Sequence, residues 1–234
     1  MNATPTAPAE TPAAEPVHEP APVKPARPGL WRQIYRDYRR YRAEGKGRAA
    51  ALFAPGLWAT GMYRATRWAT RTIRFAPARK LFTVPLTVLT KVFELGTGIT
   101  VPYGGEIGEG FYIENYGTIV LASRGGIGDN CTVCQGVTIG LAGRKDQREA
   151  PVIGNRVYIG PNAVLVGKLT VGDDAVICAG AVVTRSIPPR AVVLGNPARV
   201  MSHEGSFEYI RYDGMESDPD RSASLTQVKH ATTG

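Results

Sequence analysis

Aliphatic residues return every six positions through the middle of the chain, with two interruptions, between Ile107 and Arg199. The repeating residues are Ile107, Ile113, Ile119, Ile127, Val133, Ile139, Ile153, Ile159, Leu165, Val171, Ile177 and Val183. A second small or apolar residue often stands two places earlier, as Cys131 and Ala163 do. Positions i and i−2 share a face in a strand and not in a helix. A strand and a turn that recur every six residues predict a parallel β-helix.

Glycine and one long insert punctuate this repeat. Glycine directly follows six of the aliphatic positions, at Gly108, Gly128, Gly140, Gly154, Gly160 and Gly172, where the chain must turn. The larger interruption, at 140–152, is polar and charged, and a smaller one spans Ala122 to Gly126. Loops on a rigid scaffold often carry function, so we expect the excursion loop 140–152 to border the site.

The regions outside the repeat divide the chain further. Residues 1–28 are rich in Ala, Pro and Glu, which predicts a disordered tail. Residues 29–97 show helical spacing, and 98–201 hold the repeat. Residues 202–234 are polar and lack periodicity, so we expect a poorly ordered tail with at most a short element near 207–212. The predicted fold class is mainly β, a β-helix preceded by a small α-helical region.

Arginines line the predicted helices, for example Arg64, Arg67, Arg71 and Arg74 at spacings of three or four. Such a face is either a solvated helix surface or a surface that attracts an anionic membrane or a polyanionic glycan. No nucleic-acid-reading motif accompanies the charge, so nucleic acid is not an expected partner.

The chain has a net charge of +8 and contains three cysteines, and the cysteines indicate the redox compartment in which it works. An odd number of cysteines gives no disulfide framework and indicates a reducing compartment. Cys131 and Cys134 form a C-x-x-C without a second pair or a nearby His, so no metal site is expected. No secretory signal or membrane-spanning run is visible, which predicts a cytoplasmic protein, with contact at the inner face of the membrane as an option.

Three segments together resemble a known family: 127–140 (IGDNCTVCQGVTIG), 150–183 (APVIGNRVYIGPNAVLVGKLTVGDDAVICAGAVV) and 186–200 (SIPPRAVVLGNPARV). They resemble the hexapeptide-repeat acyltransferases, and within them the serine O-acetyltransferase-like branch. The resemblance covers roughly Arg36 to Met201. Polysaccharide O-acetyltransferases share the pattern, so the expected acceptor is L-serine or a sugar hydroxyl.

The resemblance implies a left-handed β-helix with three hexapeptides per turn. It further implies a homotrimer with active sites between neighbouring prisms, acetyl-CoA as the acetyl donor and a small-molecule acceptor. A solenoid buries its core between coils and leaves flat faces that can pack against copies of the same chain.

The family's general base is a His, and Asn115 stands at its position in Ile113 to Ile119. An amide does not accept a proton at neutral pH. The chain's histidines are His18, His203 and His230, all outside the repeat.

Three explanations follow from this departure. Another group acts as base, with Glu114 the first candidate and Glu149 or Tyr116 behind it. Alternatively, the protein is a catalytically silent scaffold or CoA-binding relative. In the third, His203 of a neighbouring chain reaches the site.

The cofactor side follows the family more closely. Small residues that let a pantetheine arm approach the backbone, and arginines for its phosphates, fall at matching positions. They are Gly140, Leu141, Ala142, Gly160, Pro161, Ala179, Gly180, Arg185 and Arg199. Arg148 lies near the family's acceptor-binding Arg, but its spacing to Pro151 differs by one, which leaves serine recognition open.

Overall fold

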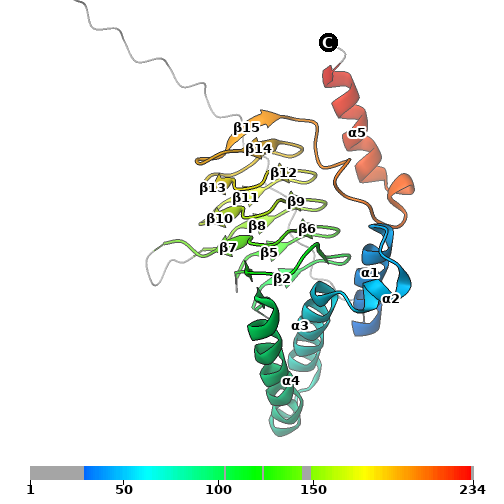
Figure 1. Cartoon of the computed structure of the whole chain (residues 1–234), viewed down its shortest axis with the longest axis vertical. Helices are drawn as coiled ribbons and strands as arrows, with labels where there is room; N and C mark the ends of the chain where they lie inside the picture. Colours follow the sequence, from blue (N-terminus) through cyan, green and yellow to red (C-terminus); the bar gives the residue numbers. More distant parts are fainter. Residues whose placement is uncertain (1–28, 103, 123, 144–148, 233–234) are drawn as a thin grey trace, which may run out of the picture.

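The computed structural model describes residues 29–102, 104–122, 124–143 and 149–232. The predicted tail at 1–28 and Arg148 of the excursion loop lie outside these residues. Most of the described chain forms a prism of short parallel strands, with helices below it and beside it (Figure 1). The predicted left-handed parallel β-helix with a preceding helical region is confirmed.

Three sheets form the sides of the prism, and their strands pair in parallel except for β15, which is antiparallel to β14. Sheet A contains β1 (Ile99–Thr100), β4 (Ile119–Val120), β7 (Thr138–Gly140), β10 (Val164–Val166) and β13 (Val182–Val183). Sheet B contains β2 (Glu106–Ile107), β5 (Gly126–Ile127), β8 (Val152–Ile153) and β11 (Thr170–Val171). Sheet C contains β3 (Tyr112–Ile113), β6 (Thr132–Val133), β9 (Tyr158–Ile159), β12 (Val176–Ile177), β14 (Val192–Leu194) and β15 (Arg199–Ser202).

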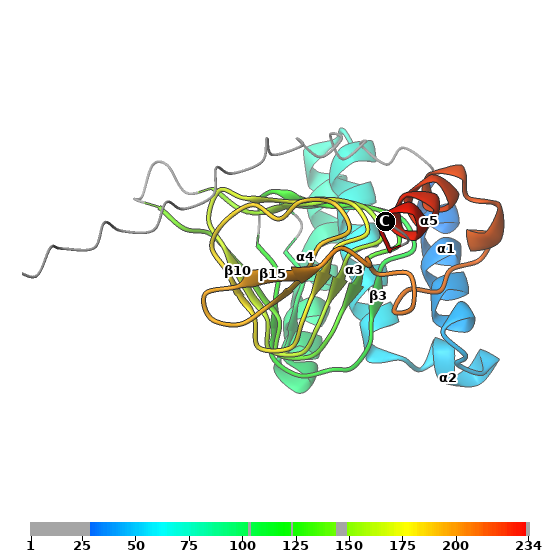
Figure 2. The same cartoon turned by 90° about the horizontal axis from the view of Figure 1, so that it is seen from above.

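The repeating aliphatic residues point into the prism and stack in register. In sheet C, Ile113 pairs with Val133, Val133 with Ile159, and Ile159 with Ile177. All four side chains are at most 2% exposed. Seen from above, the strands enclose this core as three sides of one prism (Figure 2). Burial of this column is the main stabilising force of the prism.

Three columns of turns join the sheets, and each forms one edge of the prism. We call the turns from sheet C to sheet A (115–118, 135–137, 161–163 and 179–181) the Asn115 edge. The turns from sheet A to sheet B form the loop edge, and their described residues include 121–122, 124–125, 141–143, 149–151, 167–169 and 184–186. The turns from sheet B to sheet C (108–111, 128–131, 154–157 and 172–175) are the ladder edge.

Side chains bind successive coils together along the ladder edge. Asp129 Oδ1 accepts a hydrogen bond from the Glu109 amide of the coil below, at 2.7 Å. Asn155 Oδ1 accepts from the Asp129 amide at 2.9 Å, and Asp173 Oδ1 accepts from the Asn155 amide at 2.8 Å. These bonds satisfy turn amides that no strand partner reaches.

Four helices precede the prism: α1 (Leu30–Ala43), α2 (Arg48–Leu52), α3 (Pro55–Thr72) and α4 (Ala76–Thr97). Helices α3 and α4 form a hairpin that projects from the base of the prism (Figure 1). Pro55 and Pro77 lie in the first turns of α3 and α4, where a missing N–H costs nothing.

A buried ion pair fastens the helices to the first coil. Arg64 and Asp37 are each 1% exposed, and Arg64 Nη2 lies 2.8 Å from Asp37 Oδ1. Arg64 also donates to the Gly108 carbonyl at 2.6 Å, while Asp37 accepts from the Phe111 amide at 3.1 Å. Burial opposes the charge on Arg64, but Asp37 overcomes that effect and raises the arginine pKa. For Arg64, therefore, neither a solvated face nor a membrane-facing surface describes its environment.

The C-terminal segment differs from the expected poorly ordered tail. After β15, it forms a 3-10 turn (Met215–Ser217) and α5 (Pro219–Thr232), beside α1 and the prism (Figure 2). Ile210 is fully buried, and Ser206 Oγ donates to the Arg156 carbonyl at 2.5 Å. The segment lacks sequence periodicity because it packs as an extended strap through isolated side chains.

Candidate functional site

The predicted site residues fall on two different edges of the prism. Glu114, Asn115, Tyr116, Gly160, Pro161, Ala179, Gly180 and Arg199 lie at or above the Asn115 edge. Gly140, Leu141, Ala142, Glu149 and Arg185 lie at the loop edge. The two edges are the opposite ends of the strands of sheet A. One chain therefore does not bring its two groups of candidate residues together.

Asn115 is an exposed residue immediately after the third strand. Its Nδ2 donates to Gln135 Oε1 at 3.2 Å, which joins two successive coils. Gln135 is partly buried, and Tyr116 beside it is 66% exposed. The pair presents amide groups that donate and accept hydrogen bonds, and neither amide takes up a proton.

Glu114 is partly buried and is held by a neighbour that the sequence did not reveal. Cys134 donates its S–H to Glu114 Oε2, with 2.9 Å between sulfur and oxygen. The hydroxyl oxygen of Tyr158 lies 3.3 Å from the same sulfur. A thiol has one hydrogen, so Tyr158 donates to the sulfur while the thiol donates to Glu114. The result is a hydrogen-bonded chain across three successive coils, Tyr158 to Cys134 to Glu114.

Burial and the neighbouring carboxylate keep this chain protonated. Burial, together with the hydrogen bond to Glu114, raises the pKa of Cys134 to about 12. Burial also raises the pKa of Tyr158, whose ring stacks on Tyr209 with centroids 4.9 Å apart. At neutral pH the thiol is therefore a fixed hydrogen-bond donor and Glu114 is the acceptor at its end.

The small residues along the Asn115 edge serve two purposes. A Cβ added to Gly160 would lie 2.9 Å from the Ala179 nitrogen, so the stacking of coils itself requires glycine there. Gly180 has φ +69°, and a Cβ there would meet nothing within 4 Å. Ala179 and Gly180 are exposed, so this part of the edge offers open backbone to a ligand.

The loop edge carries the base of the excursion loop. Ala142 and Glu149 form an antiparallel bridge, with both N···O distances at 3.2 Å. Lys168 of the next coil forms an ion pair with Glu149 at 3.2 Å, between exposed side chains. Arg185 is exposed one coil higher. These groups are suited to contact an anionic or polar ligand at the surface.

His203 is exposed just after β15, at the far end of the prism from Asn115. Asn115 follows β3 and His203 follows β15, so the four strands β6, β9, β12 and β14 lie between their positions in sheet C of one chain. His230 belongs to α5, and His18 lies outside the described residues.

A polar cavity of about 530 Å³ lies elsewhere, where the ladder edge faces α1 and the C-terminal strap. Its arginines are already paired with carboxylates, as Arg36 is with Glu109 at 3.2 Å and Arg156 is with Asp174 at 2.7 Å. None of the predicted site residues lines it. Among the described residues, no group of three or more His, Cys, Asp or Glu side chains is placed to hold a metal ion.

Known proteins with similar sequences are transferases built from hexapeptide repeats, in agreement with the coiled prism. A family model described as bacterial transferase hexapeptide (six repeats) matches residues 150–185. Serine acetyltransferase of Helicobacter pylori is 31% identical over 153 residues, which cover 65% of this chain and 85% of that protein. Serine acetyltransferase of Bacillus subtilis is 33% identical over 165 residues, covering 68% of this chain and 75% of that protein.

Solved structures give the same result. Serine acetyltransferase of Brucella abortus in complex with coenzyme A superposes with a TM-score of 0.63 at 26% identity, over 75% of this chain and 68% of that one. Soybean serine acetyltransferase complexed with serine has a TM-score of 0.63 at 26% identity, over 74% and 69% of the two chains.

The coiled prism, its excursion loop and its small-residue edge define a hexapeptide-repeat acyltransferase. The chain belongs to the serine acetyltransferase family.

Proposed function

We propose that this protein transfers an acetyl group from acetyl-CoA to a hydroxyl group of a small-molecule acceptor, L-serine or a sugar. The observation that carries the proposal is the Glu114 carboxylate at the Asn115 edge, fixed by the Cys134 thiol at 2.9 Å. It is a proton acceptor one residue from the place of the family's base. The serine acetyltransferases of Helicobacter pylori and Bacillus subtilis support acetyl transfer.

In the proposed reaction, Glu114 removes the proton of the acceptor hydroxyl. The hydroxyl oxygen then attacks the thioester carbonyl carbon of acetyl-CoA, and a tetrahedral intermediate forms. Its collapse breaks the carbon–sulfur bond and forms the O-acetyl ester. The proton held by Glu114 passes to the departing sulfur, which leaves as the CoA thiol.

Asn115 and Gln135 orient the acceptor in this scheme. Their amides are joined at 3.2 Å and are exposed or partly exposed beside Glu114. Such groups fix the direction of a hydroxyl without exchanging protons with it. Tyr116 and Glu149 are the remaining candidates for the base, and Arg148 is a candidate contact for an acceptor carboxylate.

Homotrimer formation completes the proposed site. When prisms pack side by side, the Asn115 edge of one chain faces the loop edge of its neighbour. Glu114 then meets the neighbour's excursion loop, and acetyl-CoA lies along the groove between them. The cofactor contacts we propose are Gly140, Leu141, Ala142, Gly160, Pro161, Ala179, Gly180, Arg185 and Arg199.

The experiment measures loss of thioester absorbance with acetyl-CoA and either L-serine or nucleotide sugars, using the purified full chain. Calorimetry with CoA runs in parallel, and light scattering reports whether the mass is three times 25.1 kDa. Turnover with one acceptor class supports the proposal and names the acceptor. CoA binding without turnover on any acceptor would instead support the silent-scaffold alternative, which Asn115 favours.

The proposed location is the cytoplasm, where acetyl-CoA is made and used. The described residues contain no helix with the length and apolar character needed to cross a bilayer. Contact with the membrane surface depends on the exposed apolar side chains of helix α4, which are described below.

A further inference from the structure

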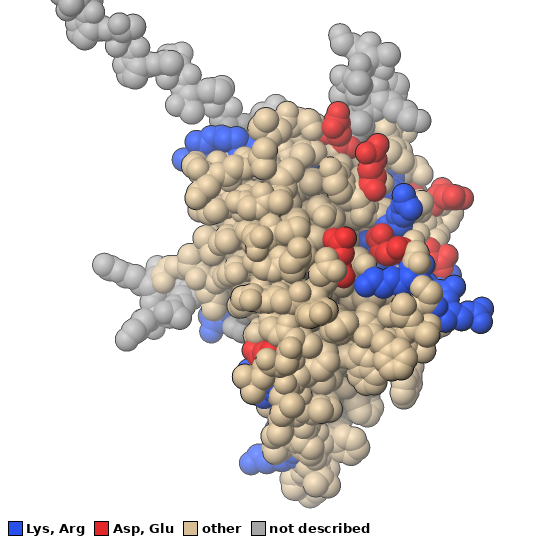
Figure 3. Space-filling view, in the orientation of Figure 1, with Lys and Arg blue, Asp and Glu red and all other residues tan. Residues whose placement is uncertain are grey.

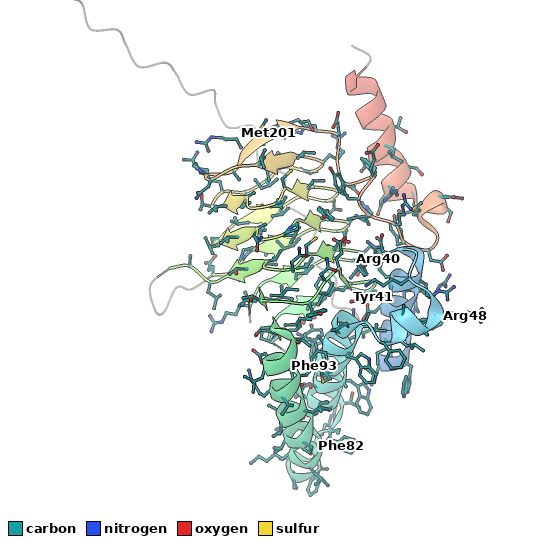
Figure 4. The ribbon with its side chains drawn as sticks, viewed as in Figure 1. Arg40, Tyr41, Arg48, Phe82, Phe93 and Met201 are labelled. Atoms are coloured by element: carbon teal, nitrogen blue, oxygen red, sulfur yellow. The ribbon has the colours of Figure 1, made fainter. Side chains whose placement is uncertain are left out.

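Helix α4 has its apolar side chains on the outside. None of its residues is buried. Its outer face carries large apolar side chains that are 58 to 89% exposed, namely Leu81, Phe82, Val84, Val88, Val92 and Leu95. Figure 4 shows Phe82 near the end of the hairpin that is far from the prism, and Phe93 nearer the base. A surface helix of a globular protein normally turns such residues toward its core.

The inner face of α4 carries threonines together with Leu86 and Phe93, and Phe93 packs against the core. Thr83, Thr87 and Thr90 are half-buried and follow one helical stripe, and Thr90 contacts Met62 of α3. Their hydroxyls donate to the carbonyl oxygens four residues earlier, at 2.9, 2.7 and 2.7 Å. The polar groups are thus satisfied within the helix, and the apolar groups are left for a partner.

Cationic charge gathers at the hairpin turn beside this face. Residues 45–93 contain nine Lys and Arg and no Asp or Glu, and the first carboxylate of α4 is Glu94, near the prism, which pairs with Lys91 at 2.7 Å. Arg74, Arg79 and Lys80 lie at the turn of the α3–α4 hairpin, and no described carboxylate forms an ion pair with them. In Figure 3 the end of the hairpin far from the prism shows a basic side chain and no acidic one.

We infer that the α3–α4 hairpin binds the surface of an anionic lipid bilayer, with the outer face of α4 in the headgroup region and its basic turn against lipid phosphates. Apolar area and basic charge on one helix are the two requirements for such binding. The helix lies on the bilayer and does not cross it.

Charge complementarity selects this partner over a second copy of the chain. Two copies that paired through α4 would each bring the cations of the hairpin turn, Arg74, Arg79 and Lys80, and like charges that meet at an interface disfavour association. A bilayer with anionic headgroups neutralises the same charge while it covers the apolar face. An anionic membrane was one of the partners predicted for the Arg-rich helices, but the surface differs, because Arg64, Arg67 and Arg71 are engaged with Asp37 and Glu106.

Flotation of the full chain with phosphatidylcholine vesicles, with and without phosphatidylglycerol, tests the inference. We expect binding only to the anionic vesicles, and weaker binding as salt is raised. The triple variant Arg74→Glu, Arg79→Glu, Lys80→Glu is expected to bind about a hundredfold more weakly. The matched control is the triple variant Arg32→Glu, Arg42→Glu, Arg211→Glu. It has the same net charge as the hairpin variant, but its three exposed substitutions lie outside the hairpin, so it is expected to bind nearly as the parent does.

A second variant, Leu81→Ser, Phe82→Ser, Val88→Ser, tests the apolar face. It is expected to fold, because exposed substitutions change stability little, and to lose vesicle binding. Absence of binding by the parent chain overturns the inference, as does equal binding by the hairpin and control charge variants. A lower oligomeric mass of the serine variant in light scattering also overturns it, because the face would then belong to a second copy.

Discussion

The thiol of Cys134 donates a hydrogen bond to the carboxylate of Glu114, with 2.9 Å between Sγ and Oε2. The two residues are twenty positions apart but adjacent in sheet C, because Glu114 follows β3 and Cys134 follows β6. Their contact fixes a carboxylate beside the amide of Asn115, and Glu114 is therefore the residue we propose as base in place of the family's His.

Replacement of Glu114 by Gln is expected to lower kcat by about 10²- to 10⁴-fold, the usual contribution of a positioned general base. CoA affinity should stay unchanged, because the substitution keeps the shape of the side chain. Thioester loss and calorimetry measure the two quantities. Glu149→Gln and Tyr116→Phe serve as controls, and a larger loss in either one would move the role of base to that residue.

Replacement of Cys134 by Ala is expected to lower kcat by about fivefold, because the loss of one hydrogen bond costs about 1 kcal/mol of positioning. Cys134→Ser keeps a donor and should recover most of the rate. A merely structural role would lower the melting temperature of both variants without this difference in kcat. Equal kcat values for the Ala variant and the parent would show that the thiol does not position Glu114.

The three thiols should differ in reactivity toward iodoacetamide at pH 8. Burial raises the pKa of Cys131 and of Cys134 to about 12, so almost none of either is the reactive thiolate. Cys178 is only partly buried and should be modified first. Mass spectrometry of peptides after a timed reaction checks the order, and denaturant should make all three react alike. Early modification of Cys134 would contradict its burial against Glu114.

Stability should decline at alkaline pH for the same reason. A thiol whose folded-state pKa is raised to about 12 holds its proton longer in the folded chain than in the unfolded one. The unfolded state therefore releases protons first, and stability falls from about pH 9 toward pH 12, by about 1.4 kcal/mol per pH unit for each buried thiol. Urea unfolding of the parent and of Cys131→Ala across this range measures the slope, which should be shallower in the variant.

The Arg64–Asp37 pair should dominate the attachment of the helices to the prism. Asp37→Asn leaves a buried arginine unpaired, and we expect a loss of about 3–5 kcal/mol in the free energy of unfolding. Arg36→Ala removes a half-exposed partner of Glu109 and should cost no more than about 1 kcal/mol. Similar losses in both variants, measured by urea unfolding, would contradict the structural role of the buried pair.

The prism was predictable because one face of every strand repeats in the sequence. Ile113, Val133 and Ile159 carry the period of six, and all three line the core. The outer face has no such period. Cys134 contacts Glu114, twenty residues earlier, and Tyr158, twenty-four residues later. The two separations differ because each insert lengthens a different coil, so no fixed period in the sequence indicates these contacts.

The helical region shows the same limit. The spacing of Arg64 and its neighbours fits an exposed stripe, but Asp37 lies on another helix, and no local pattern reveals a pair separated by 27 residues. Likewise, Ser206 and Ile210 anchor the C-terminal strap through single side chains, and isolated anchors leave no periodic signal. The position of Asn115 could be read from the resemblance, whereas its Gln135 partner required the stacking of coils.

Both ends of the stack of coils are sealed. Helices α3 and α4 lie under the first coil, and β15 runs antiparallel to β14 and closes the last one. A parallel coil cannot continue past a reversed strand, so the molecule does not polymerise end to end. The interior coils, by contrast, are interchangeable modules. Duplication of one whole coil between β9 and β10 would lengthen the protein by about 4.8 Å while leaving both seals and the alignment of all three edges intact.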